Sequence, residues 1–192
     1  MKNILTMVLT GLVLSVTSCK EKDKASPSEN AISTFLTAEN GITLAPRTSG
    51  PWELGVVFSV SKAGKITQLG SKMPDPGIYR VIIWDFETKQ LLRQKSIEQT
   101  APDQLVLDGV ESLELAVNKR YVVSINSQSA GTNKRYLFAR NATSTGFMPF
   151  TQGSVLVHSA CYIGASTATF PGTVTNVQNE LYGLPEFTFI PD

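Results

Sequence analysis

WELGVVFSV, residues 52–60, carries large apolar side chains at Leu54, Val56, Phe58 and Val60. Successive side chains of an extended chain point to opposite faces, so these four would share one face of a strand. A helix would instead repeat its apolar positions every three or four residues. The stretch therefore predicts a β-strand that has one face in a hydrophobic core.

The same period of two recurs along most of the chain. Further alternating runs are YRVIIWDF (79–86), SLELAV (112–117), RYVVSIN (120–126) and EFTFI (186–190). Glycine, proline and aspartate separate these runs, as in PDPG at residues 74–77. Many short strands with turns between them are typical of an all-β protein. We expect a jelly-roll-like β-sandwich of two antiparallel sheets.

Two stretches depart from simple alternation. In GKITQLG, residues 64–70, Ile66 and Leu69 are three apart, so a regular strand would send them to opposite faces. A β-bulge would place both in the core. Residues 166–180 show no alternation and are rich in threonine, asparagine and glycine. Loops of that length are uncommon unless they are functional, so binding is expected at the loops of one end of the sandwich.

The first residues resemble a bacterial lipoprotein signal peptide, assigned here to residues 1–18. Residues 4–16 are mostly apolar, and this run is shorter than the ~20 residues that a membrane-spanning helix needs. Val16-Thr17-Ser18-Cys19 resembles a lipobox, which implies cleavage before Cys19 and lipid on its sulfur. Two or more acyl chains would give a stable membrane anchor.

Residues 19–35 are predicted to be a flexible tether that carries a single β-sandwich domain at residues 36–192. The first part of this segment has no large apolar residue and is rich in charge and serine. Lys20 follows the cysteine, which by resemblance to Gram-negative sorting signals favours the outer membrane. The mixed charges of residues 20–24 favour the side that faces the cell exterior.

The charge balance limits the partners. The chain has 17 basic and 16 acidic residues, and removal of Lys2 with the signal peptide would leave 16 of each. A near-neutral chain lacks the basic surface that nucleic acid requires. It also lacks a polybasic membrane-binding surface, so attachment to the membrane is expected through the lipid on Cys19.

The sequence offers little for catalysis. His158 is the single histidine, and Cys161 is the single cysteine besides Cys19. On a regular strand, residues three apart point to opposite faces, so these two are not expected to form a nucleophile–base pair. Cys161 is interpreted as a small buried apolar residue. No enzymatic activity is expected.

No cofactor or metal is expected either. One histidine and one spare cysteine do not make a zinc pattern, and the chain has no EF-hand motif. A calcium ion held by scattered carboxylates remains open, with Asp75, Asp85 and Asp103 as candidates.

Aromatic residues are the candidates for a binding surface, because sugar rings stack on flat side chains while polar neighbours hold their hydroxyls. Trp84 and its neighbour Arg80 would lie on the face away from Val81. Tyr136 and Arg140 would share a strand face, and Tyr182 closes the long polar segment. We predict ligand contacts at Trp84, Tyr136, Arg140 and Tyr182. The alternative for each aromatic residue is simple packing in the core.

Three stretches in order resemble the domain-of-unknown-function family 4082: ELGVVFSVSKAGKITQLGSKM (53–73), GIYRVIIWDFETKQLLRQK (77–95) and LELAVNKRYVVSIN (113–126). The resemblance extends roughly over residues 52–192. It implies a small β-sandwich domain of bacterial surface proteins. Members often accompany glycan-active enzymes, which implies contact with carbohydrate.

We therefore expect a lipid-anchored, non-catalytic surface protein that binds a ligand, with a carbohydrate as the first candidate. The alternative is a structural or adhesion subunit that binds another surface protein through an exposed strand edge. A small hydrolase is a third hypothesis.

Overall fold

The computed structural model describes residues 26–143 and 145–192. The predicted signal peptide and Cys19 lie outside these residues. The elements in chain order are α1 (Ala31–Ala38), β1 (Ile42–Arg47), β2 (Trp52–Val60), β3 (Gly64–Ser71), β4 (Gly77–Asp85), β5 (Leu91–Gln99), β6 (Val106–Leu115), β7 (Tyr121–Asn126), β8 (Gln128–Ser129), β9 (Thr132–Asn133), β10 (Tyr136–Asn141), β11 (Phe150–Gln152), β12 (Val155–Gly164), β13 (Thr173–Val174), β14 (Glu180–Tyr182) and β15 (Glu186–Pro191).

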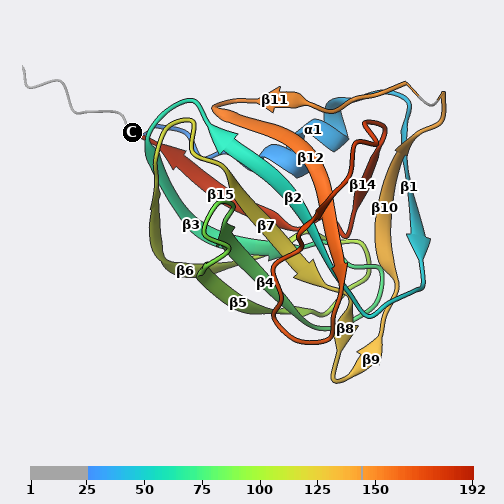
Figure 1. Ribbon diagram of the computed structural model, residues 1–192. Coiled ribbons are helices and arrows are strands. Elements are labelled where there is room, and N and C mark those ends of the chain that lie inside the picture. Colours follow the sequence, from blue (N-terminus) through green and yellow to red (C-terminus); the bar gives the residue numbers. More distant parts are fainter. Residues whose placement is uncertain (1–25, 144) are drawn as a thin grey trace, which may run out of the picture.

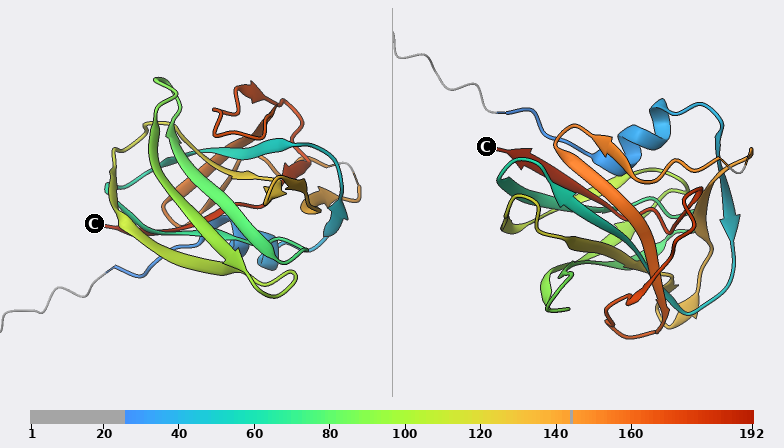
Figure 2. Two further views of the ribbon diagram at one scale, coloured as in Figure 1. Left: turned by 90° about the horizontal axis from the view of Figure 1, so that it is seen from below. Right: turned by 45° about the horizontal axis from the view of Figure 1, so that its top comes forward.

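Two antiparallel sheets face each other across the core (Figures 1 and 2). The larger has the order β11-β12-β2-β7-β4-β5, with β13 added beside β12, and the facing one has the order β15-β3-β6. Phe58 of the larger sheet stacks on Phe187 of the facing sheet, with 4.4 Å between ring centroids. The prediction of an all-β sandwich is confirmed.

A third sheet, β1-β10-β14, closes one end of the sandwich, at the right of Figure 1. Leu137, Ala139 and Leu181 point from it into the core and are buried. Residues directly opposite each other in antiparallel strands share a face, and Phe138 is opposite Tyr182. Phe138 and Tyr182 therefore share the other face of this sheet, and Tyr136 and Tyr182, at the edge of the main core, line the site described below.

The alternation predicted for β2 and β4 is confirmed. Leu54 and Val56 of β2 and Tyr79 and Val81 of β4 lie in the main core. The opposite face of the larger sheet has a smaller core of its own, made of Val57, Ile82, Trp84, Val122 and Cys161. Phe170, from the long segment 166–180, packs on this smaller core. The segment thus covers part of the sheet's outer face.

The bulge predicted between Ile66 and Leu69 is confirmed. The register of β3 with β6 shifts between Ile66 and Gln68, and both apolar residues are fully buried. The extra residue turns the side chain of Leu69 back to the core face, so that Ile66 and Leu69 both point into the core although they are three residues apart.

A second bulge was not predicted, and it corrects the face assignment in β12. The register with β2 shifts between Val157 and Ser159. Beyond the shift, Ala160 takes the core face and Cys161 joins the smaller core. His158 binds Ser59 on the same outer face of the sheet. The prediction that His158 and Cys161 point to opposite faces is therefore wrong, because the bulge reverses the alternation between them.

The packed domain begins before the predicted boundary at residue 36. Glu29 pairs with Phe189 of β15, and the carboxylate of Glu29 accepts the backbone N–H of Ser154 at 2.8 Å. Ile32 of α1 is buried, and Phe35 stacks on Phe150 with 3.6 Å between centroids. The described start of the chain and its C-terminal strand consequently lie side by side in Figure 1.

Candidate functional site

An open cleft lined by aromatic rings lies where the end of the larger sheet meets β10 and β14. Its volume is about 250 Å³. Its lining, which we call the aromatic cleft, consists of Ser49, Trp52, Leu54, Tyr136, Tyr162 and Tyr182. Four of the six side chains are aromatic, which is the usual lining of a small-molecule site.

The register of β2 with β12 builds one wall of the cleft. Leu54 lies opposite Tyr162, and Trp52 begins β2 just outside the buried part of the strand. The rings of Trp52 and Tyr162 meet edge to face, with centroids 5.9 Å apart, and both are half-buried. Tyr162 meets Tyr182 in the same way at 6.3 Å. The rings support one another, so the wall is held in place before any ligand arrives.

A hydrogen-bonded chain fixes the polar part of the same wall. The indole N–H of Trp52 donates to the hydroxyl of Ser49 at 2.9 Å, and this hydroxyl lies 3.0 Å from that of Tyr136. Gly50 has a φ of +122°, and a side chain there would meet the hydroxyl of Ser127 at 2.9 Å. Glycine at this position lets the turn bring Ser49 against Trp52.

Tyr182, on β14, continues the aromatic wall from Tyr162. Its ring stacks on Phe138 at 5.4 Å, and its hydroxyl donates to Glu180 at 2.7 Å. Burial and the carboxylate of Glu180 raise the pKa of Tyr182, so its hydroxyl stays a neutral donor. The next residue, Gly183, has a φ of +74°, and a side chain there would come within 2.8 Å of Ile125. This close approach packs the backbone of Gly183 against Ile125 and Leu54, and it sets the position of β14 and Tyr182 beside the core.

The structure brings two of the four predicted ligand residues together in one cleft. Tyr136 and Tyr182 line the aromatic cleft. Arg140 shares this face of the sheet but does not line the cleft, and its Nε lies 3.5 Å from the carboxylate of Glu180. Trp84 lies apart from them, in the smaller core, and is 5% exposed. Its indole N–H donates to Ser124 at 2.8 Å, which leaves no free polar group for a ligand.

Sequence reasoning missed Ser49, Trp52 and Tyr162. Trp52 stands at the first position of the strand that opened the sequence analysis, and this position at a strand end was the available signal. Tyr162 reaches the cleft because the β12 bulge sets its register opposite Leu54. The bulge leaves no clear mark in the sequence, so Tyr162 could not have been placed.

His158 and Cys161 do not form a reactive pair. The thiol of Cys161 is fully buried, and burial raises its pKa, so it stays protonated. Burial lowers the pKa of His158, and its Nε2 lies 2.9 Å from the hydroxyl of Ser59. In the described part of the chain, the two side chains are not hydrogen-bonded to each other.

Two of the three carboxylates considered for calcium, those of Asp75 and Asp85, have other partners. Arg135 binds the carboxylate of Asp75 at 2.6 Å, and Lys119 binds that of Asp85 at 2.6 Å. Within residues 26–143 and 145–192, no three acidic, histidine or cysteine side chains gather as metal ligands would. The described helix, α1, is too short to cross a membrane.

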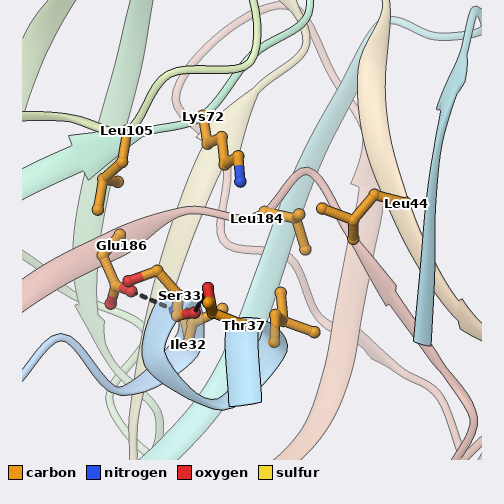
Figure 3. A pocket seen from close by; sticks show the side chains of 9 residues that line it. Ile32, Ser33, Thr37, Leu44, Lys72, Leu105, Leu184 and Glu186 are labelled. Carbon is orange, nitrogen blue, oxygen red and sulfur yellow. Dashed lines mark hydrogen bonds between the residues drawn. The ribbon is translucent and has the colours of Figure 1, made fainter. Parts of the chain in front are cut away.

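A second hollow lies between α1, β1 and β15 (Figure 3). Its enclosed volume is about 30 Å³, which is close to the space of one water molecule. The ammonium of Lys72 points into it, and at its edge Glu186 accepts the backbone N–H of Ser33 at 2.6 Å. Two wider, shallower hollows of about 360 and 500 Å³ also include Lys72. The hollow of about 360 Å³ includes Leu44 and Pro46 of β1, and we call it the groove beside β1.

No protein-family model matches this chain, and no curated protein is detectably similar to it. The resemblance to family 4082 therefore stays a prediction.

Proposed function

We propose that the protein is a non-catalytic binding protein and that its ligand is a carbohydrate held in the aromatic cleft. The observation that carries the proposal is the grouping of Trp52, Tyr162 and Tyr182 around one open cleft. The C–H faces of a sugar ring fit against flat aromatic side chains, and its hydroxyls require donors and acceptors close by. The hydroxyls of Ser49 and Tyr136 lie beside the rings.

The lining of the cleft supports binding rather than hydrolysis. Glycoside hydrolysis needs two carboxyl groups on either side of the bond that is cleaved. None of the six residues that line the cleft carries a carboxylate. The carboxylate of Glu180 lies next to it but accepts the hydroxyl of Tyr182 and faces Arg140. A single carboxylate held in this way favours a structural role.

The location of the protein in the cell is a second part of the proposal. We infer that lipid on Cys19 holds the protein at the outer membrane, on the side that faces the cell exterior. The packed domain begins at Glu29, so only a short segment would separate it from the lipid. A surface location would expose the cleft to glycans outside the cell.

Calorimetry and a glycan array test the proposed function. The protein from residue 26 onward is screened on the array, and the strongest oligosaccharide is titrated into it in a calorimeter. Binding is expected to weaken about tenfold in Trp52→Ala, because a stacked aromatic ring contributes up to about 1.5 kcal/mol and a tenfold change corresponds to about 1.4 kcal/mol. Trp84→Phe, at the other tryptophan, is the matched control and should bind like wild type. Equal losses in both variants would contradict a site in the cleft.

A protein partner is the second candidate, and the groove beside β1 favours it. β1 is an edge strand with β10 as its single neighbour, and Leu44 on it is 39% exposed. An apolar side chain on a free strand edge is a common docking point for another chain. If this candidate is right, Leu44→Asp should abolish co-purification of a surface protein from outer membranes. Tyr182→Ala should leave that co-purification intact.

A further inference from the structure

Arg47 stands next to the aromatic cleft at the end of β1. It lies directly opposite Tyr136, a cleft residue, so the two side chains share one face of the sheet. Its guanidinium lies over the ring of Phe138, with 3.7 Å between its central carbon and the ring centroid. Ala45, the residue opposite Phe138, is small and leaves that ring uncovered for Arg47.

The charge of Arg47 is not compensated. Arg140, on the same sheet face, has the carboxylate of Glu180 at 3.5 Å. Arg47 is exposed and forms no ion pair with any residue of the described chain. The sheet face therefore has two guanidinium groups and one carboxylate, and the unmatched positive charge lies beside the cleft.

The position of Arg47 over the ring of Phe138 suits its guanidinium to bind a carboxylate. A guanidinium presents five N–H donors in a planar fork that matches the two oxygens of a carboxylate. The contact with Phe138 holds the guanidinium beside the cleft, and Phe138 in turn stacks on Tyr182 of the cleft. The donor fork and the aromatic wall thus belong to one packed row of side chains.

We propose that the cleft takes an acidic sugar, in which a uronic acid ring lies against the aromatic wall and its carboxylate binds Arg47. This proposal rests on the proposed function, because it names the ligand class of the same cleft. Arg140, beyond Tyr182 from Arg47, already faces the carboxylate of Glu180, so the uncompensated positive charge lies at the Arg47 end. The acid group is therefore directed to one end of the cleft.

Matched oligosaccharide pairs test the proposal. Three acidic probes are titrated by calorimetry: α-1,4-linked trigalacturonic acid, a mannuronate oligosaccharide and a hyaluronan tetrasaccharide. Each is compared with its carboxyl-reduced, neutral partner. At low ionic strength at least one acidic probe should bind about tenfold more tightly than its neutral partner, and salt should reduce the difference.

Variants assign the preference to one side chain. Arg47→Gln should lower affinity for the acidic probe about tenfold and leave affinity for the neutral partner within about twofold. Arg120→Gln is the control, because Arg120 also lies over a phenylalanine ring, Phe86, but stands at the other end of β7 from the cleft. Loss of the preference in Arg120→Gln as well would overturn the proposal.

The possible results distinguish binding of an acidic sugar at Arg47 from binding of carbohydrate in general. Equal binding of acidic and neutral partners would overturn the acidic ligand and leave the carbohydrate function standing. An acidic preference that survives in Arg47→Gln would overturn the role of Arg47. Absence of binding by every acidic and neutral probe, together with an array on which nothing binds, would overturn both.

Discussion

Replacement of Tyr182 by alanine is expected to weaken both the fold and the binding of a glycan. The ring is half-buried and packs on Phe138 and Tyr162. Removal of a fully buried aromatic ring costs about 3–5 kcal/mol, so a half-buried one should cost about 2 kcal/mol. The lost hydrogen bond to Glu180 adds about 1 kcal/mol. For a domain of this size, about 3 kcal/mol lowers Tm by roughly 6–12 °C.

Tyr182→Phe separates the ring from its hydroxyl. This variant keeps the stacking and loses only the hydrogen bond to Glu180, so its free energy of unfolding should fall by about 1 kcal/mol. Calorimetry with the strongest oligosaccharide from the array should show affinity within about threefold of wild type for Tyr182→Phe. Tyr182→Ala should bind about tenfold more weakly, which corresponds to about 1.4 kcal/mol.

The pattern across variants decides whether the reasoning holds. Trp84→Phe disturbs the smaller core and lowers Tm without touching the cleft. Its affinity should stay at the wild-type value, which shows that lower stability alone does not reduce binding. If Tyr182→Ala lowers Tm as expected and keeps wild-type affinity, Tyr182 is a packing residue and the cleft is not the binding site.

Three further predictions concern other parts of the chain. The Lys119 ammonium and the Thr88 N–H lower the pKa of Asp85 from 3.8 to about 2, so this carboxylate stabilises the fold above pH 3.8 and the contribution is lost as the pH falls through 2. Asp85→Asn should therefore lower the free energy of unfolding by about 1 kcal/mol at pH 7, after allowance for the solvent around Lys119, and by almost nothing below pH 2. Urea unfolding at both pH values measures this difference. An equal loss at both pH values would refute it. Cys161 should react with a thiol reagent only after unfolding, because it is buried; rapid labelling of the native protein, followed by mass spectrometry, would contradict this. Cys19→Ala should release the protein from membranes in a fractionation, and unchanged retention, or a Cys19 without lipid in wild type, would refute the lipid anchor.

The strand pattern was predictable because alternation is a local property. Leu54 and Phe58 repeat with a period of two, and this is enough to place them in the core. The bulge at Ile66 and Leu69 was predictable for the same reason, because both residues are large and apolar and a regular strand could not bury both. In β12, by contrast, Ala160 and Cys161 are both small and apolar, so either register buries an acceptable side chain and the sequence gives no preference.

The site was predictable only in part, because other segments of the chain decide whether an aromatic ring is buried or lines a cleft. Trp52 and Trp84 both stand on strands of the larger sheet. Phe170, far along the chain, covers Trp84, while Trp52 lies at the open end of the sandwich. No local sequence pattern shows which aromatic ring a distant segment will cover. The helix α1 was also missed, because a single stretch of eight residues is too short to show a helical stripe.

Fluorescence of Trp52 tests the aromatic cleft most directly. The chain has two tryptophans, so Trp84→Phe leaves Trp52 as the single indole, and it lies in the cleft. The strongest oligosaccharide from the array is titrated into this variant while quenching by acrylamide is measured. We predict a saturable loss of quenching, with the same Kd as calorimetry, because the bound sugar covers the indole. Binding by calorimetry with unchanged quenching of Trp52 would place the ligand elsewhere and contradict the account.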